Sequence, residues 1–441
     1  MEHLLPEINL LFTREGMFSR WLTVEAALAN AQAGLEIIPP EVARDIIENA
    51  QIEKLDLTRY DELYEKTGHP MVAMLKLLEA AAGPASGQFI HLGATTQDIM
   101  DTALMLAIKK MYAHVQHKLK SILRSVAGLC ERHAGTPMMG RTHNIHALPI
   151  TFGYKAAIWG DEMIRALDRL EQSKSRVLAL QMSGAVGSMV SFDGRGSEIH
   201  QLMAQELELA VPDICWHVAR DRFAEFVGEL ALLAGLFGRI AQEIYLLMGS
   251  EIAELSEPWA SGKVGSTAMP HKINPTSSQH MMSLARDIRY HHGAVLEMMW
   301  VDHERNIMHF VGERQHIEAA CIAAGELLDR ADDLLADLVV NEKNMLENIN
   351  KLGGLTQSEH VMRELGKAIG KQRAHELVGE IAVHAYQNHE NFADLLRGHD
   401  VVMQHISAEK IKDLLDPLPY LGECQVLARQ VAAKIRNRVN G

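Results

Sequence analysis

Apolar positions along this chain recur at the spacing of long amphipathic helices. Side chains that could form a buried stripe follow one another every three to four residues over several extended segments. Alternation of polar and apolar residues over a convincing length is absent, so the pattern predicts no strand. Five long helices are predicted, at Asp98–Arg132, Thr151–Leu178, Asp221–Leu255, Ser277–Met299 and Gln315–Leu338.

Shorter helices are predicted on either side of this group. Gly16–Ala33 has helical spacing and is stopped by two prolines before a second helix near Glu41–Ala50. Beyond Asn341 the helical segments are shorter and are interrupted at Gly353-Gly354 and at Pro417–Pro419. The pattern therefore predicts an all-α fold with an elongated central helical bundle between smaller N- and C-terminal helical domains.

We predict three domains with boundaries set by these changes in helix length. They are an N-terminal helical domain at 1–97, a central domain at 98–340 that contains a loop at 256–275, and a C-terminal helical domain at 341–441. The long helices carry apolar stripes rich in Leu, Ala and Met that are wider than one thin bundle can cover. We therefore expect homo-oligomerisation through the helices.

Composition and charge narrow the class of protein. Apolar residues make up 47% of the 441 positions and aromatic residues only 5%, a balance that favours helix. The net charge of −14 argues against a nucleic-acid or anionic-membrane partner. The four cysteines lack CxxC spacing, and neither a signal peptide nor eighteen consecutive apolar residues are found. We expect a cytoplasmic protein without a disulfide framework.

Three polar segments interrupt the helices and carry the candidate chemistry: His91–Asp98, Gly140–His146 and Ser256–Pro275. The last holds Ser266, with Lys272 six residues and Asn274 eight residues further on. Removal of a proton from a carbon beside a carboxylate needs a base, an acid for the leaving group, and cations or amides that stabilise the growing charge. A serine acts as base only if its alkoxide is stabilised by nearby N–H groups and a cation. We interpret Ser256–Pro275 as a loop that closes over an anionic substrate.

Other interpretations of these residues fit the sequence less well. A solvated Gly/Ser linker would explain Gly265-Ser266 alone, but the polar residues that follow make it a poor account. The GxxxxGK[ST] order of a phosphate loop is absent, and His143 and His146 do not form HExxH or another metal signature. A Ser/His/Asp hydrolase remains an alternative use of the same parts, although the GxSxG elbow is missing.

The three segments resemble the signatures of the fumarase/aspartase superfamily. The blocks that match are Gly265-Ser266-Thr267-Ala268-Met269-Pro270-His271-Lys272-Ile273-Asn274-Pro275, His91-Leu92-Gly93-Ala94-Thr95-Thr96-Gln97-Asp98 and Gly140-Arg141-Thr142-His143-Asn144-Ile145-His146-Ala147. The similarity runs from about Phe12 to the C-terminus. It is greatest to the branch that holds adenylosuccinate lyase and 3-carboxy-cis,cis-muconate cycloisomerase.

This resemblance implies a homotetramer around a twenty-helix core, with each active site built from three subunits and with no metal or organic cofactor. It implies that Ser266 removes the proton β to the leaving group and that His143 is the general acid. Lys272 would act with Asn274 to stabilise the aci-carboxylate intermediate. The other residues to which it assigns substrate binding are His69, His91, Thr95, Thr96, Thr142, Arg305 and Arg314.

Departures from the family pattern bear on the substrate. Adenylosuccinate lyases usually have an Arg-Tyr pair where this chain has Glu2-His3 and an Arg-His-Asp triplet where it has Gly68-His69-Pro70. The hydroxyl residues that meet the phosphate are replaced around Phe310-Val311. Each charged hydrogen bond lost costs roughly 1.5–3 kcal/mol, which disfavours a nucleotide substrate. In contrast, His143 is kept, whereas bacterial cycloisomerases tend to lack that histidine.

The sequence therefore predicts a carbon–nitrogen lyase, similar to adenylosuccinate lyase, that acts on a small anionic dicarboxylate. Anti β-elimination from a succinyl-type substrate, an N-substituted aspartate, would release fumarate. Two alternatives stay open: a lactonising enzyme similar to 3-carboxy-cis,cis-muconate cycloisomerase, and a structural homologue that has lost catalysis.

Overall fold

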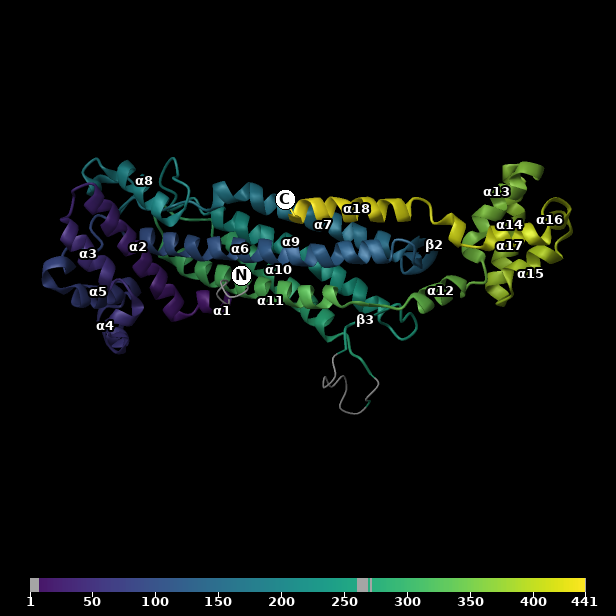
Figure 1. The fold of residues 1–441 in the computed structure, drawn as a ribbon, viewed down its shortest axis with the longest axis horizontal. Coiled ribbons are helices and arrows are strands. Elements are labelled where there is room, and N and C mark those ends of the chain that lie inside the picture. The colour runs from purple at the N-terminus through teal and green to yellow at the C-terminus, as the bar shows by residue number, and fades with distance from the viewer. Residues whose placement is uncertain (1–7, 260–268, 270–271, 441) are drawn as a thin grey trace. The chain divides into compact units, whose positions relative to one another are not determined.

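The structure is built almost entirely of helices. The computed structural model describes residues 8–259, 269 and 272–440 of the 441-residue chain, except for the side chains at 308–311. Helix makes up 72% of it and strands are few (Figure 1), so the predicted all-α fold class is confirmed. The five predicted long helices correspond to α6 (Thr96–Arg132), α7 (Phe152–Val177), α9 (Asp221–Leu247), α10 (Thr276–Glu297) and α11 (Ile307–Ala336).

These helices agree with the prediction to within a few residues at most ends. The exceptions are the start of α11, which was predicted at Gln315 and lies at Ile307, and the end of α9. The apolar pattern continues to Leu255, whereas the helix ends at Leu247. Ala253 has φ of 49°, a left-handed conformation that an α-helix does not contain. The chain therefore turns after α9, and Leu255 instead begins a short strand.

The chain divides into two compact units, which are described in turn. The first comprises Met1–Lys118, Ala166–Gly235 and Ser283–Asp329, and the second comprises Leu119–Arg165, Leu236–Met282 and Arg330–Gly441. The boundary falls within each of the five long helices. The three domains expected at 1–97, 98–340 and 341–441 stay a prediction.

In the first unit, short helices surround α2. The side chain of Thr13 accepts a hydrogen bond from the N–H of Gly16 and so starts α2, while Pro40 occupies the first turn of α3. A small core of Ala29, Ile38, Val42, Ala43 and Ile46 lies between α2 and α3. The elements are α1 (Ile8–Leu11), α2 (Arg14–Gly34), α3 (Pro40–Asn49), η1 (Ile52–Lys54), η2 (Leu57–Arg59), α4 (Tyr60–Thr67), α5 (Pro70–Gly87), η3 (Val190–Phe192) and α8 (Gly196–Leu207), with parts of the long helices.

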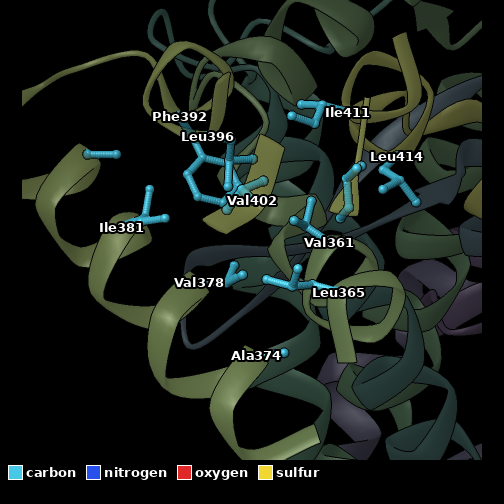
Figure 2. Packing of buried hydrophobic residues seen from close by; sticks show 12 residues of the cluster. Val361, Leu365, Ala374, Val378, Ile381, Phe392, Leu396, Val402, Ile411 and Leu414 are labelled. Carbon is cyan, nitrogen blue, oxygen red and sulfur yellow. The ribbon is translucent and has the colours of Figure 1, made fainter. Parts of the chain in front are cut away.

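The second unit contains the short helices of the C-terminal region and four strands. Its elements, besides parts of the long helices, are β1 (Pro137–Thr142), β2 (Ile145–Thr151), β3 (Leu255–Ser256), β4 (Val339–Val340), α12 (Glu342–Asn350), η4 (Leu355–Gln357), α13 (Ser358–Ile369), α14 (Lys371–Asn388), α15 (Phe392–Gly398), α16 (Asp400–His405), α17 (Ala408–Leu415), η5 (Leu418–Tyr420) and α18 (Cys424–Asn440). Helices α13 to α17 enclose one hydrophobic cluster, in which Phe392 and Leu396 of α15 point toward residues of α13, α14 and α16 (Figure 2).

The expectation of no strand was wrong for two short antiparallel pairs. β1 pairs with β2 and β3 pairs with β4. The β1–β2 register shifts between Met139 and Arg141, and both Met138 and Met139 are fully buried. A strand with a bulge and two consecutive buried apolar residues does not alternate cleanly, which is why the pattern gave no strand signal.

Helix α9 is also the one described helix that is long and apolar enough to cross a membrane. Its most apolar stretch of 18 residues has a mean hydropathy of 1.5, but 56% of that stretch is buried inside the protein. A core helix of a soluble protein has the same length and composition, so this similarity is weak evidence for a membrane span.

Replacement of Phe392 tests the packing of the C-terminal helices. Phe392 is fully buried, so Phe392→Ala should lower the free energy of unfolding by about 3–5 kcal/mol through lost transfer energy and a cavity. Tyr386 on α14 is 66% exposed, and Tyr386→Ala is the matched control that should change it by less than about 1 kcal/mol. Urea denaturation followed by circular dichroism measures both. Equal effects of the two variants would contradict this packing.

Candidate active site

Three segments of the first unit meet at the start of α6. The side chain of Arg305 donates from Nη1 to Oγ1 of Thr95 at 2.8 Å, and Nη2 donates to the backbone carbonyl of Ala185. Thr95 immediately precedes the 37-residue α6, and Thr96 is its first residue. The N-terminus of a helix presents free N–H groups and a positive dipole end to an anion. Hydroxyl, guanidinium and helix terminus together make a suitable place for a carboxylate.

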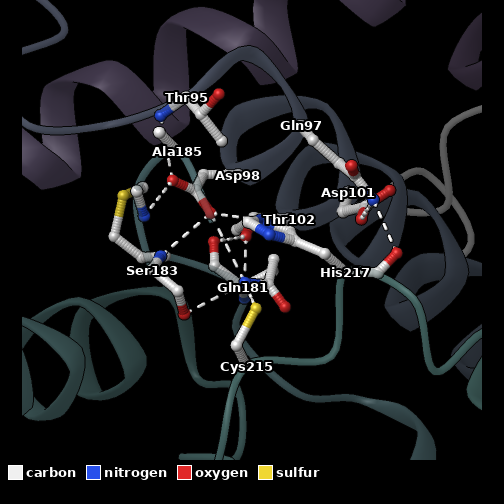
Figure 3. A network of polar contacts seen from close by, with 12 residues as sticks. Thr95, Gln97, Asp98, Asp101, Thr102, Gln181, Ser183, Ala185, Cys215 and His217 are labelled. Atoms are coloured by element: carbon white, nitrogen blue, oxygen red, sulfur yellow. Dashed lines mark hydrogen bonds and ion pairs between the residues drawn. The ribbon is translucent and has the colours of Figure 1, made fainter. Parts of the chain in front are cut away.

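The buried carboxylate of Asp98 fixes the backbone segments that form this arrangement. Asp98 is fully buried and accepts hydrogen bonds at 2.9 Å from the backbone N–H groups of Thr95, Ser183 and Gly184. It also accepts from Nε2 of His217 at 2.7 Å, and Figure 3 shows these contacts converging on it. Burial alone would raise the pKa of Asp98, but the hydrogen bond and charge of His217 outweigh it, so the pKa is lowered. Asp98 is therefore a fixed anion that ties the turn at 183–184 to the start of α6.

His217 is the positive partner of this buried carboxylate. Its side chain is 2% exposed. Burial by itself lowers the pKa of an imidazole, but the hydrogen bond to Asp98 and its charge raise the pKa of His217 to about 9. His217 is thus an imidazolium at neutral pH.

A second buried ion cluster lies one turn further along α6. Arg220 donates to Asp101 from Nη1 at 2.7 Å and from Nη2 at 2.9 Å, and from Nε to Glu313 of α11 at 3.0 Å. Burial raises the pKa of Glu313 despite the attraction of Arg220. Because each of these side chains is at most 3% exposed, the cluster fixes α6, the start of α9 and α11 to one another within the first unit.

The other site residues predicted in this unit have different partners. Nδ1 of His69 accepts a hydrogen bond from the N–H of Val72 at 3.4 Å and caps α5. Nδ1 of His91 lies 2.6 Å from Oε1 of the buried Glu25. Burial by itself lowers the pKa of His91, but the hydrogen bond to Glu25 outweighs it and the pKa is raised. The structure therefore joins Thr95 to Arg305 and gives both histidines partners in the protein.

Arg314 lies on α11 and is half-buried. Its Nε is 3.3 Å from Oε1 of Glu318, one helical turn away, and its Nη1 is 2.8 Å from Sδ of Met17. Neither of these contacts joins Arg314 to the Thr95–Arg305 pair. Its assignment to substrate binding stays a prediction.

In the second unit, the β1–β2 hairpin carries the predicted acid. His143 and Asn144 form the two-residue turn between Thr142 and Ile145, with φ of 52° and 64°. Thr142 and His143 are both exposed at this tip. The hairpin places the imidazole in solvent, where it is accessible to a ligand.

An ion pair fixes the base of the hairpin. Arg141 donates from Nη1 and Nη2 to the two carboxylate oxygens of Glu254, at 3.0 and 2.7 Å, and Glu254 is fully buried. Asn348 of α12 donates to the same carboxylate at 2.7 Å. The pKa of the nearby His146 is lowered, first by burial and then by the charge of Arg141. This bidentate pair positions the residue two places before His143.

The predicted catalytic loop is anchored by a carboxylate as well. Glu257 accepts hydrogen bonds from the N–H groups of Ser277 at 3.0 Å and Ser278 at 2.8 Å, so it caps α10 and joins the two ends of the loop. Lys272 is exposed and Asn274 is half-buried between these ends. Ser266 lies outside the described residues, and its role as base stays a prediction.

Sequence reasoning missed the residues that position the site. Asp98 and Glu257 lay inside segments that were recognised, but neither was singled out, and His217, Arg220 and Glu254 lay outside those segments. Each is a charged or titratable residue in an ordinary polar stretch, and its burial depends on segments far away in the sequence. Within the ranges 8–259, 269 and 272–440, no group of three or more His, Cys, Asp or Glu side chains is arranged to hold a metal ion.

Comparison with known proteins places this arrangement in a family. Residues 4–289 match the family described as "Lyase", and residues 354–431 match "Adenylosuccinate lyase C-terminus". The chain belongs to the fumarase/aspartase superfamily of lyases. Among its relatives in this superfamily is an N-acetyl-S-(2-succino)cysteine lyase of Dickeya dadantii, 36% identical over 95% of this chain and 92% of that protein.

Two further superfamily members are similar over nearly the whole chain. An adenylosuccinate lyase of Methanocaldococcus jannaschii is 34% identical over 98% of this chain and 94% of its own. The crystal structure of the 3-carboxy-cis,cis-muconate lactonizing enzyme from Pseudomonas putida superposes with a TM-score of 0.93, at 29% identity, over 98% of this chain and 97% of that one. The resemblance inferred from the three motifs is therefore confirmed.

The His217–Asp98 pair predicts a pH-dependent contribution to the stability of this lyase. A folded-state pKa of about 9, raised from 6.5, means that this contribution is complete below pH 6.5 and is lost as the pH rises through about 9. The difference in free energy of unfolding between the wild type and His217→Asn should therefore shrink by up to roughly 3 kcal/mol between pH 6.5 and 9.5.

Urea denaturation at several pH values measures this difference. His384→Asn is the control, because His384 is exposed and lies 3.5 Å from the exposed Glu390. The stability difference for that control should stay nearly constant over the same range. A wild-type advantage that persists unchanged at pH 9.5 would show that the His217 charge does not support the fold.

Proposed function

We propose that this lyase releases fumarate from a succinyl-type substrate by anti β-elimination. The observation that carries the proposal is the pairing of Thr95 with Arg305 at the start of α6. A succinyl group has two carboxylates. A guanidinium, a hydroxyl and a helix N-terminus are suited to bind one of them, while elimination requires the other to accept charge as the neighbouring C–H bond breaks.

The motif residues divide the chemistry among them in this proposal. Ser266, as alkoxide, takes the proton from the carbon β to the leaving group, and the electrons move into the adjacent carboxylate to give the aci-carboxylate. Lys272 and Asn274 stabilise that intermediate. His143 then protonates the leaving atom as its bond to carbon breaks, and fumarate is formed. The remaining predicted substrate-binding residues are His69, His91, Thr95, Thr96, Thr142, Arg305 and Arg314.

The leaving group of the proposed reaction is a small amine, as in an N-substituted aspartate. The relative at 34% identity, which is named for adenylosuccinate, supports an amine. A second candidate is a thiol, because the relative at 36% identity is named for a succinylated cysteine. The mechanism is the same for both, since the acid protonates either nitrogen or sulfur. The replaced phosphate contacts in the sequence favour a substrate without a nucleotide.

The proposal extends to assembly and location. We propose a cytoplasmic homotetramer around a twenty-helix core, with each active site shared by three subunits and with no nucleic-acid or membrane partner. The resemblance to the superfamily, the net charge of −14 and the wide apolar stripes of the long helices support this view.

A substrate panel tests the reaction. Fumarate release should be fastest with a small N- or S-substituted succinate, and at least about tenfold slower in kcat/KM with adenylosuccinate because one or more charged contacts are missing. The panel also contains argininosuccinate, aspartate and carboxymuconate. Formation of a lactone from carboxymuconate without fumarate release from any succinate would favour the cycloisomerase alternative, and inactivity on every compound would favour a structural homologue.

Ser266→Ala, measured with the best substrate of this panel, should reduce kcat by about 10²–10⁴-fold, because a general base acts only in the transition state. Ser261→Ala changes a serine in the same loop and should leave kcat within about twofold. Wild-type turnover by Ser266→Ala would refute its assignment as the base.

Arg305→Met tests the carboxylate site itself. Loss of one charged hydrogen bond of roughly 1.5–3 kcal/mol should lower kcat/KM by about 10–150-fold, mainly through KM. Arg195→Met is the matched control, because Arg195 is a partly exposed arginine of the same unit that pairs with Glu198. An unchanged KM in Arg305→Met would exclude this arginine from substrate binding.

A further inference from the structure

Cys215 differs from the other cysteines of the chain in its surroundings. Cys130, Cys321 and Cys424 are buried, whereas Cys215 is partly exposed. It lies in the connection between α8 and α9, two residues before His217. Nε2 of Gln181 donates to its sulfur at 3.5 Å (Figure 3). The thiol is thus part of the polar network around Asp98 and is accessible from outside.

Carboxylate, imidazole and thiol follow one another in this network. Nε2 of His217 is held by Asp98 at 2.7 Å, while its other ring nitrogen, Nδ1, is buried and has no hydrogen-bond partner among the described residues. Gln181 links the thiol to this pair, because its Nε2 lies 3.5 Å from Sγ of Cys215 and 3.4 Å from Oδ1 of Asp98, the oxygen that His217 contacts. A cationic imidazole fixed beside a thiol is the environment in which a cysteine becomes nucleophilic.

Of the charges near the thiol, the positive charge of His217 favours its ionised form. Burial would raise the pKa of Cys215, but the neighbouring His217 outweighs it and the pKa is lowered. The negative charge of Asp98 is paired with His217. Burial lowers the pKa of His200, which lies in the same network, so His200 does not add a second positive charge. In contrast, burial raises the pKa of Cys130 to about 12 and also raises that of Cys321.

The sulfur also lies directly against a turn of the carboxylate site. A Cβ atom placed on Gly187 would come within 2.6 Å of Sγ of Cys215, and Gly187 has φ of 82°. The same turn supplies the N–H of Gly184 to Asp98 and the carbonyl of Ala185 to Arg305. Any group attached to the sulfur on this side would therefore push the turn away from Asp98 and Arg305.

We propose that Cys215 is a nucleophilic modification site, and that an adduct of a small soft electrophile on its sulfur displaces the Gly184–Gly187 turn and so disrupts the Thr95–Arg305 pair. With a haloacetamide, the thiolate sulfur bonds to the methylene carbon and the halide leaves with its electron pair. With an activated alkene, sulfur bonds to the β carbon, the π bond breaks, and the α carbon takes a proton from the His217 imidazolium or water. Labelling at Cys215 does not depend on the proposed lyase reaction.

Alkylation of the full-length protein by iodoacetamide tests the thiol. Peptide mass spectrometry should find Cys215 labelled well before Cys130, Cys321 and Cys424, which serve as internal controls. For an ordinary thiol of pKa about 8.5, the rate rises about 150-fold between pH 6 and 8.5, whereas for Cys215 the rise should be less than about 30-fold. An ordinary rise, or earlier labelling of another cysteine, would overturn the proposal.

The role of His217 is tested by His217→Asn, which should restore the steep pH dependence of labelling. If this variant does not fold, the wild-type pH profile alone decides the question. The control is His384→Asn, which changes an exposed histidine of the second unit. In this variant Cys215 should be labelled with the same pH dependence as in the wild type.

The effect on the turn is measured separately. Stoichiometric labelling should weaken binding of fumarate, followed by isothermal calorimetry, by about tenfold or more, while Cys215→Ser treated with the same reagent should bind as before treatment. Labelling that leaves fumarate binding unchanged would overturn the displacement of the turn. If neither labelled nor unlabelled wild type binds fumarate or turns over any succinate, the proposed function fails, whereas the reactivity of Cys215 stands or falls on its labelling rate.

Discussion

The buried carboxylate of Asp98 is the contact on which the rest of the candidate site depends. It gathers backbone N–H groups from two segments and the ring of His217 around one charge. Removing a carboxylate from water is costly unless its oxygens are fully hydrogen bonded. Here that requirement leaves the turn at 183–184 few alternatives, and the same turn then presents the carbonyl of Ala185 to Arg305. Positioning of the exposed arginine is thus a consequence of satisfying the buried anion.

The same principle recurs at the other motifs of the chain. Glu254 fixes the hairpin through Arg141, and Glu257 caps α10 at the foot of the loop. In each case a buried or nearly buried acid, rather than an apolar contact, fixes the backbone next to a residue predicted to act on substrate. Buried ion pairs add little net stability compared with apolar packing, but a missing partner is heavily penalised, so they select one arrangement of the segments. This selectivity is what a site needs when its parts come from distant segments.

One polar network thereby connects two kinds of chemistry in the first unit. Asp98 organises a place for an anionic ligand on one side and, through His217, a thiol of lowered pKa on the other. The two sides share the Gly184–Gly187 turn, whose glycines allow the backbone to approach both Cys215 and Asp98 closely. A change at one side is for this reason transmitted to the other by a displacement of backbone, without any need for a larger conformational change.

The sequence by itself determined the class of fold, the long helices and the family. Helical periodicity is a local property, so segments such as α6 and α11 could be predicted from their own residues, and the motifs around Thr95, His143 and Lys272 are contiguous. Only the tertiary structure decided which charges are buried together. Asp98 and His217 are 119 residues apart, and the β1–β2 hairpin depends on Glu254 and α12 more than on its own alternation. Burial and pairing of charges depend on which segments meet in space, and no local pattern encodes that.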